Sequence, residues 1–354
     1  MSSRERVLLA LAHKEPDRIP IAPPHGMVNI GEAVRQFIET FPFDRFVSLN
    51  PSKKTSRAVN QAISERRGTF GKTVIDDFGC VYKYKGVGMP YCVYHPLADA
   101  KKAEEIEEYK KWPDPNDPSL VPKDTHKKAR KLYEGTSYST VVSLPNIFHR
   151  YQRLRGFSRW LLDMKTNHEL HQALADKIHN RNMTLALRLL NEVGDYTNLA
   201  MIFDDMGGTT GPFMSLADFR RFVKPYYKQL IEKIRREFPE IKFWFHCHGN
   251  IMQFVKDIID CGFDVLNPIL PGDNMKPEKL KKKFGRQLSF DGGVDVEFLL
   301  PFGRVGEVQE HARKVIETLA AGGGYIFRVQ MISNVVPARN LYAAYRTALE
   351  CGGY

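Results

Sequence analysis

Two histidines separated by one residue follow an apolar run in the segment Phe243–Asn250. Along a strand, side chains at i and i+2 point to the same face, so His246 and His248 are expected to project together while Cys247 points away. Neutral imidazole is a common metal ligand, and a His-x-His pair at a strand end can hold zinc from one side. The alternative is a hydrogen-bonded pair without metal. The spacing favours a zinc site.

Other polar or metal-competent side chains stand where predicted strands end. Active sites of barrel enzymes gather at the carboxyl ends of strands, so such a ring is what an active site on that face requires. Asp205 is expected to act in catalysis together with His246 and His248. The residues expected to contact a substrate are His25, Asn146, Asp204, Asn267, Asp291 and Met331. For each of them taken singly, capping a loop is the alternative.

Short apolar runs alternate with longer amphipathic segments, and eight of these runs are predicted to be strands. They are Ile19–Pro23, Arg45–Leu49, Ser139–Leu144, Leu199–Phe203, Lys242–His246, Asp264–Asn267, Gln287–Phe290 and Tyr325–Val329. Helices are predicted over Leu216–Phe238, Ile251–Cys261, Lys276–Phe284 and Gly303–Ala321. This alternation predicts an α/β fold of the (β/α)8 TIM-barrel type. A doubly wound open sheet is the alternative, but no Gly-x-Gly-x-x-Gly motif follows an early strand.

The N-terminal part predicts a helical and hairpin elaboration of the barrel. The segment Val74–Tyr94 alternates apolar and polar residues and predicts a β-hairpin inserted beside the barrel. The proline-rich stretch Trp112–Pro118 predicts a rigid surface turn. Because no internal repeat is visible, residues 1–354 are expected to form a single barrel domain.

Composition narrows the class of protein. No apolar run approaches the roughly 20 residues that cross a bilayer, and the first residues predict a short amphipathic helix rather than a signal peptide. Five cysteines without a CxxC motif are expected to be reduced thiols, which favours a cytoplasmic enzyme. The net charge of +11 gathers in lysine-rich clusters at 123–131 and 276–286. These clusters are interpreted as solvated helix faces or a surface for an acidic partner, and no motif indicates nucleic acid.

Several blocks spread over nearly the whole chain carry a resemblance to a known family. They are residues 4–20, Leu154–Phe157, Asp204–Gly207, Pro212–Ser215, Phe219–Tyr226, His246–Asn250, Phe263–Pro268, Gly292–Asp295 and Gly322–Ile326. Through these blocks the sequence resembles the uroporphyrinogen decarboxylase superfamily. The resemblance implies a (β/α)8 barrel, in agreement with the strand count reached from the apolar pattern.

The resemblance implies one of two chemistries. One branch of the superfamily decarboxylates the acetate arms of a tetrapyrrole without a cofactor. The other branch consists of zinc-using methyltransferases that move methyl groups to or from the cobalt of a corrinoid protein. It includes the substrate-side components of O-demethylase systems.

Two departures separate this sequence from the decarboxylase branch. That branch carries paired arginines just after the first strand, where this sequence has none before Arg35. It also has a histidine after the last strand, near the position of Met331. Because neither His nor Met supplies the bidentate carboxylate recognition of arginine, both departures favour the methyltransferase branch.

The zinc site implied by the resemblance is incomplete. The thiol-methylating branch binds zinc through His-x-Cys and a later cysteine; here the first half is His246-x-His248 and the second falls near Met331. Methionine is a poor zinc ligand, so a third ligand must come from elsewhere on the ring, and Asp204 or Asp205 is the first expected candidate. His25 and Asp291 come after them, and a water or substrate oxygen could complete the site.

The expected function is methyl transfer from a small, methoxylated substrate to the corrinoid of a partner protein. Zinc, or the histidines as general acids, would draw charge from the methoxyl oxygen as the methyl group leaves. A homodimer is the expected assembly, with no nucleic acid or membrane partner. The aromatics expected to line an apolar pocket, or else to belong to the core, are Tyr91, Phe148, Phe203 and Phe213. The alternatives are a uroporphyrinogen-type decarboxylase and a non-catalytic barrel homologue.

Overall fold

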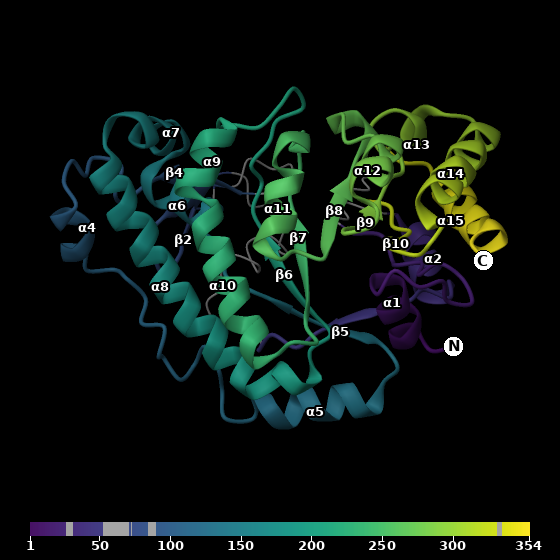
Figure 1. Ribbon diagram of the computed structural model, residues 1–354, viewed down its shortest axis with the longest axis horizontal. Helices are drawn as coiled ribbons and strands as arrows, with labels where there is room; N and C mark the ends of the chain where they lie inside the picture. The colour runs from purple at the N-terminus through teal and green to yellow at the C-terminus, as the bar shows by residue number, and fades with distance from the viewer. Residues whose placement is uncertain (26–30, 52–70, 72, 84–89, 331–334) are drawn as a thin grey trace.

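A parallel sheet of seven strands forms the centre of the molecule (Figure 1). The computed structural model describes residues 1–25, 31–51, 71, 73–83, 90–330 and 335–354. In sheet order the strands are β1 (Phe46–Ser48), β5 (Ser139–Ser143), β6 (Leu199–Phe203), β7 (Lys242–His246), β8 (Val265–Ile269), β9 (Ser289–Gly292) and β10 (Tyr325–Ile326). The order follows the chain, and every neighbouring pair is parallel. Seven of the eight predicted strands are therefore confirmed.

The predicted strand Ile19–Pro23 is the exception. Its segment makes isolated parallel bridges, Ile21 with Phe327 and His25 with Gln330, rather than a continuous ladder. On its other side, Ile21 accepts a hydrogen bond from the N–H of Asp44, just before β1. The segment thus lies between the last and the first strand of the sheet. Its three prolines (20, 23 and 24) have no N–H to donate, which explains why no regular strand forms.

The sheet is buried on both faces. On the outer face, Phe245 of β7 meets Tyr227 of α10 (Lys224–Glu237), with ring centroids 5.6 Å apart. On the inner face a smaller apolar cluster fills the space that the sheet encloses. Its buried members are Val7, Leu11, Ala22, Val141, Leu199, Trp244, Val265 and Ile326. Because parallel strands are covered on both sides, the three central residues of β7, Phe243 to Phe245, are all apolar.

Helices α1 and α2 precede β1, and most later helices lie between consecutive strands of the sheet. The helices are α1 (Ser3–Leu11), α2 (Glu32–Thr40), α4 (Glu104–Glu108), α5 (Thr125–Gly135), α6 (Phe148–Arg155), α7 (Phe157–Thr166), α8 (His168–Val193), α9 (Leu216–Phe222), α10, α11 (Val255–Cys261), α12 (Pro277–Phe284), α13 (Leu299–Phe302), α14 (Val305–Ala320) and α15 (Ala338–Cys351). Three short 3-10 turns are Gly194–Tyr196, Met252–Phe254 and Pro271–Asp273. None of the described helices is both long and apolar enough to span a membrane.

The predicted helix Leu216–Phe238 is divided in two. It separates at Val223 into α9 and α10, because Pro225 occupies the first turn of α10 and cannot continue a preceding helix. Ser215 caps α9 by accepting the N–H of Asp218. The other three predicted helices correspond to α11, α12 and α14, with α11 preceded by a 3-10 turn.

The predicted hairpin Val74–Tyr94 is a three-stranded antiparallel sheet. Its strands are β2 (Thr73–Ile75), β3 (Val81–Lys83) and β4 (Tyr91–Tyr94). The Asp76 carboxylate accepts the N–H groups of Phe78 and Cys80 and so fixes the turn between β2 and β3. Because this turn ends one strand and starts another, the segment contains two hairpins instead of one.

Candidate active site

The histidine pair lies at the carboxyl end of β7. The ring of His246 is buried and that of His248 is half-buried, with centroids 4.9 Å apart. The exposed His25 faces the same place, its ring 6.1 Å from that of His246. Cys247 points away and is buried in the core, where its sulfur accepts the N–H of Met206. The period-2 spacing therefore groups the two rings as predicted.

The loop after the pair is fixed by a close backbone approach. Gly249 has φ 87°, and a Cβ at this position would lie 2.2 Å from the backbone of Gly207. Its N–H donates to the Asp273 carboxylate at 3.0 Å. Only glycine fits this place, because any side chain would meet the Gly207 backbone. This close approach fixes the backbone that follows His248.

A chain of hydrogen bonds runs from His246 into the interior of the sheet. His246 Nδ1 lies 2.5 Å from Asn267 Oδ1, and Asn267 Nδ2 donates to Asp291 at 2.6 Å. Arg328 Nε donates to both oxygens of Asp291 at 3.0 Å. Because an ionised carboxylate only accepts, Asn267 must turn its amide N–H₂ to Asp291 and its oxygen to His246. His246 therefore carries its proton on Nδ1 and leaves Nε2 as an acceptor.

The environment of His246 keeps its ring neutral. Burial lowers the pKa of His246 well below the usual histidine value, and the neighbouring His248 adds to the effect. Phe203 stacks on the ring with centroids 3.6 Å apart. A neutral imidazole with a free Nε2 is a metal ligand or a hydrogen-bond acceptor. The expectation that His246 acts as a general acid at neutral pH does not fit this environment.

Asp291, which was expected to contact the substrate, is buried and fully engaged with neighbouring side chains. Its side chain is 0% exposed, and its donors are Arg328, Asn267 and the more distant Gln330 at 3.4 Å. Burial raises the pKa of Asp291, and the Arg328 guanidinium opposes that change. Asn267, also expected to contact the substrate, is 1% exposed and serves as the link to His246.

Arg328 belongs to this hydrogen-bonded chain, although the sequence pattern did not single it out. Its guanidinium lies over the rings of Phe46 and Trp244, 5.1 and 5.2 Å from their centroids. A cation between aromatic faces and a carboxylate is stabilised inside the sheet at a position that barrels usually fill with aliphatic side chains. A charged residue within the predicted strand Tyr325–Val329 was the signal that could have revealed it.

Asp204 does not join the histidines. Its buried carboxylate accepts the N–H groups of Ile147, Phe148 and His149 at the start of α6, and the hydroxyl of Tyr227 at 2.6 Å. The carboxylate thus caps a helix N-terminus, which is a favourable place for negative charge. Burial raises its pKa, and the ring of His149 and these hydrogen bonds act in the opposite direction. This capping role corrects the expectation that Asp204 binds the metal or the substrate.

Asp205 remains at the site. Its side chain is 34% exposed, and Oδ1 accepts the N–H of His248 at 2.7 Å. Oδ2 lies 3.6 Å from Nε2 of His149, a residue that the sequence reasoning missed. His149 comes three residues after the predicted strand-end residue Asn146, in the first turn of α6. This nearness to a strand end was the available signal. The backbone N–H of Asp205 donates to the same Nε2 at 3.3 Å, so His149 lies directly beside Asp205.

The remaining expected residues separate into distinct environments. Asn146 is half-buried, and its carbonyl accepts a hydrogen bond from Asn182. Met331 lies outside the described residues. Among the aromatics, Phe203 stacks on His246, and Phe148 packs on Trp160 in the core.

The other two aromatics belong to other parts of the chain. Tyr91 is part of β4, and Phe213 contacts Phe157, with centroids 5.1 Å apart.

The fit of zinc to this site is partial. His246 offers Nε2 and has the hydrogen-bonded support on Nδ1 that metal-binding histidines use. His248 stands next to it. Over the described ranges, however, no three His, Cys, Asp or Glu side chains are grouped closely enough to hold a metal ion. The two histidines would supply two ligands, whereas a catalytic zinc site ordinarily has three from the protein.

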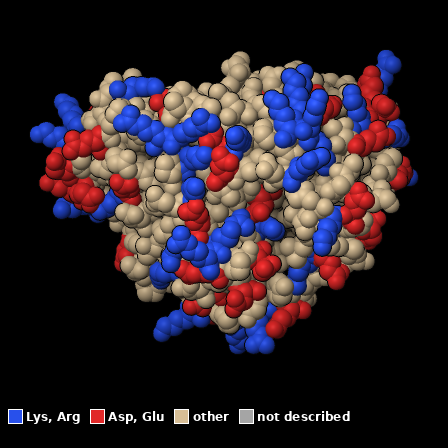
Figure 2. All heavy atoms as spheres, in the orientation of Figure 1, with Lys and Arg blue, Asp and Glu red and all other residues tan. Residues whose placement is uncertain are grey.

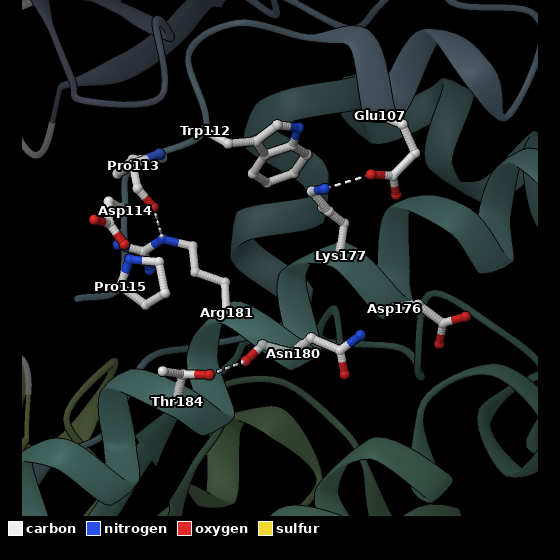
Figure 3. A pocket seen from close by; sticks show the side chains of 10 residues that line it. All are labelled: Glu107, Trp112, Pro113, Asp114, Pro115, Asp176, Lys177, Asn180, Arg181 and Thr184. Atoms are coloured by element: carbon white, nitrogen blue, oxygen red, sulfur yellow. Dashed lines mark hydrogen bonds and ion pairs between the residues drawn. The ribbon is translucent and has the colours of Figure 1, made fainter.

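A described pocket lies elsewhere, on the outer side of α8. It has a volume of about 520 Å³ and is lined by α8, by Glu107 of α4 and by the turn at 112–115 (Figure 3). Lys177 pairs with Glu107, and Arg181 Nε donates to the carbonyl of Pro113 at 2.9 Å. Its cations are thus engaged with their own neighbours, and none of the strand-end residues lines it.

Basic side chains gather on the surface over α12 (Figure 2). One of them is structural: Lys281 donates to the carbonyls of Leu319 and Gly323 at the end of α14. Lys282 and Lys283 share the last turn of α12, where cations are favourable for the helix dipole. Part of the predicted cluster at 276–286 therefore stabilises the fold.

Comparison with known proteins agrees with this architecture. A solved methyltransferase from Methanosarcina mazei superposes with a TM-score of 0.64 at 18% identity, covering 99% of both chains. Among curated proteins, the uroporphyrinogen decarboxylase of Chlorobaculum tepidum is 26% identical over 153 residues, 43% of this chain and 39% of the relative. That of Rickettsia felis is 26% identical over 141 residues, 40% of this chain and 38% of the relative. These alignments span well under half of each relative's length.

The family model of uroporphyrinogen decarboxylase (URO-D) matches residues 72–331, more than half of the chain. The matched range contains β2 to β10 and every described residue of the hydrogen-bonded chain behind His246. This protein belongs to the uroporphyrinogen decarboxylase family.

Proposed function

We propose that this protein is a methyltransferase that moves a methyl group from a small methoxylated substrate to the corrinoid of a partner protein, with zinc assisting at His246 and His248. The observation that carries the proposal is the hydrogen-bonded chain that keeps His246 neutral with Nε2 free. A decarboxylase site is organised around substrate carboxylates, whereas this chain prepares a ligand or acceptor atom. Within the proposal, residues 19–25 complete the seven-stranded sheet as the eighth member of a closed barrel.

The residues behind His246 orient the ring. Arg328 holds Asp291 through two hydrogen bonds, and Asp291 orients Asn267. The Asn267 oxygen accepts the hydrogen bond from Nδ1–H of His246. Phe203 fixes the plane of the ring by stacking on it. Such preorganisation lets Nε2 meet a ligand without a change of tautomer or rotamer.

Bound zinc would act as a Lewis acid that draws charge from the methoxyl oxygen. His246 and His248 would hold it, with Asp205 as the nearest exposed carboxylate, joined to His248 through its N–H. Since the described residues do not group three ligands, substrate or water oxygens would have to fill the remaining positions.

Proton transfer is assigned to Asp205 and His149. Nε2 of His149 lies 3.6 Å from Oδ2 of Asp205, and the Asp205 side chain is partly exposed. An ether is a poor methyl donor because its departing oxygen is basic, so a proton supplied there lowers the barrier. His246 is excluded from this role, because its lowered pKa leaves it without a proton on Nε2 near neutral pH.

Metal content and methyl transfer test the proposal together. Protein purified without a polyhistidine tag is expected to carry stoichiometric zinc and to methylate free cob(I)alamin from a methoxylated benzoate, followed by loss of the cob(I)alamin absorbance. A His246→Ala, His248→Ala double variant should lose both properties. His126→Ala, which changes an exposed histidine on α5, is the matched control and should keep both. Zinc-free protein with no transfer would refute the proposal.

Decarboxylation is the second candidate, because the curated relatives that match this sequence are named uroporphyrinogen decarboxylases. Its test is anaerobic incubation with uroporphyrinogen. Stepwise loss of carboxylates that survives the His246→Ala, His248→Ala change would favour this candidate over methyl transfer. A protein inactive in both assays would be a non-catalytic barrel homologue.

A further inference from the structure

Two cysteines lie together on the small antiparallel sheet, away from the strand-end site. Cys80 directly precedes β3, and Cys92 lies in β4 opposite Tyr82. Both sulfurs point to one backbone oxygen, the carbonyl of Arg153, at 3.3 Å from Cys80 and 3.8 Å from Cys92. The Cys92 thiol has a second acceptor, the carbonyl of Tyr94 at 3.2 Å. The fold thus brings together two sulfurs from neighbouring strands.

The two thiols differ in exposure and in acidity. Cys80 is 0% exposed, whereas Cys92 is half-buried and open to solvent. The hydrogen bond from the Cys80 thiol lowers the pKa of Cys92, and the same contact raises the pKa of Cys80. His95 Nδ1 lies 3.5 Å from the Cys92 sulfur, and the positive charge of Arg153 favours its thiolate. An accessible, acidic thiol beside a buried one is the arrangement of an attacking and a resolving cysteine.

We propose that Cys80 and Cys92 are a reversible dithiol–disulfide pair that reacts with small-molecule disulfides. The Cys92 thiolate attacks one sulfur of the small disulfide, forms a mixed disulfide and releases the other half as a thiolate. Cys80 then gives up its proton and attacks the Cys92 sulfur, which releases the second half. The net reaction converts one small disulfide and two protein thiols into one protein disulfide and two small thiols.

Oxidation would change the end of α6. Both S–H groups cease to be donors, so the carbonyl of Arg153 in the last turn of α6 loses the hydrogen bond from Cys80 and, among the contacts of the described residues, keeps His95 at 2.8 Å. The first turn of the same helix carries His149, which faces Asp205. The pair is therefore a modification site joined to the candidate active site by one short helix.

Redox titration of the whole protein tests the inference. The protein is equilibrated with glutathione mixtures of increasing oxidised fraction, quenched by alkylation and mapped by mass spectrometry. An internal Cys80–Cys92 link is expected to appear and to revert in excess reduced glutathione. Cys351 is the matched control, since it is a half-buried thiol on α15 beside Arg313 but has no second cysteine as its partner in the described contacts. It should take up glutathione only as a mixed disulfide.

Single variants separate the two roles. Cys80→Ser should arrest the reaction as a glutathione adduct on Cys92, and Cys92→Ser should leave Cys80 unmodified because it is buried. Far-ultraviolet circular dichroism shows whether each variant is folded, and the wild-type titration does not depend on either. The inference is overturned if residues 80 and 92 stay unlinked at every ratio, or if Cys92 and Cys351 accumulate the same stable adduct. Neither result bears on methyl transfer.

Discussion

The inward face of the sheet has two layers of side chains, two positions apart along each strand. One layer is apolar and the other is polar. The lower layer contains Leu199, Trp244, Val265 and Ile326. The upper layer contains His246, Asn267, Asp291 and Arg328. The lower layer is held by burial of apolar area, which has no preferred direction. The upper layer depends on hydrogen bonds with fixed donors and acceptors, so a single wrong atom disturbs all its members.

A single strand contributes to both layers. On β7, Trp244 belongs to the packed layer and His246, two residues further, to the polar one. The same step of two residues leads from Val265 to Asn267 on β8. The lower layer stabilises the fold, and the upper layer sets the chemical state of one histidine. Changes in the two layers should therefore have separable effects.

Loss of Arg328 is expected to have the largest effect. Arg328→Met leaves Asp291 buried without its cation, so the free energy of unfolding should fall by about 3–5 kcal/mol in urea denaturation. Because burial raises the pKa of Asp291 in the folded state, its protonation favours folding. The variant should regain stability as the pH falls through the folded-state pKa towards the unfolded one, and lose it as the pH rises.

A double variant controls this prediction. Arg328→Met combined with Asp291→Leu removes both charges and should recover most of the lost stability. Equal losses in the single and double variants would mean that packing, and not charge, holds the upper layer.

A cavity in the lower layer should have the next largest effect. Leu199 is 0% exposed, so Leu199→Ala should lower the free energy of unfolding by about 2–5 kcal/mol. Leu199→Met, which conserves volume, should cost less than about 1.5 kcal/mol. The nitrogen chemical shifts of His246, measured by NMR, should stay unchanged in both variants. A change of tautomer in Leu199→Ala would show that the two layers are coupled.

Breaking the link to His246 should affect its chemical state more than stability. Asn267→Leu removes the acceptor of the Nδ1 proton and a donor to Asp291, at a cost of about 1–3 kcal/mol for the unsatisfied groups. The imidazole nitrogen shifts should change from the Nδ1–H form to a mixture of tautomers. Asn180→Leu, at an exposed position of α8, should change neither property. Unchanged shifts in Asn267→Leu would refute the role of the chain.

The smallest effect is expected at Ser289 in the lower part of β9. Its buried hydroxyl makes no hydrogen bond to the described residues, and it lies two positions before Asp291. Ser289→Ala should raise the free energy of unfolding by up to about 1 kcal/mol, because an unpaired polar group leaves the interior. A clear loss of stability in urea denaturation would indicate an ordered water at this place and a polar requirement in the lower layer.

Local pattern was sufficient for most of the framework. The apolar runs predicted all seven strands of the sheet, because strands covered on both faces are continuously apolar. The segment 19–25 had the same apolar content, yet its prolines prevent a regular ladder. Similarly, Pro225 divides a region whose amphipathic period looked continuous. Both errors arise at prolines, which have no backbone N–H to donate to a strand or helix.

Adjacent residues show the limit for the site. Asp204 and Asp205 were both reasonable ligands, but the first caps α6 and only the second stays beside His248. Which of the two meets the helix depends on where α6 begins relative to the end of β6. Arg328 had no local signal for its partner, because Asp291 lies 37 residues earlier in the chain.

The order of strands and helices and the placement of His246 and His248 on one face could be predicted from the chain alone. Both depend on periods of a few residues, which the chain carries locally. The lowered pKa of His246, the capping role of Asp204 and the residues that hold the ring depend on the assembled sheet. The links from His246 to Asn267 and from Asn267 to Asp291 join residues 21 and 24 positions apart. Such pairs meet only when parallel strands align their carboxyl ends, because that alignment, and not local spacing, brings their side chains within hydrogen-bonding distance.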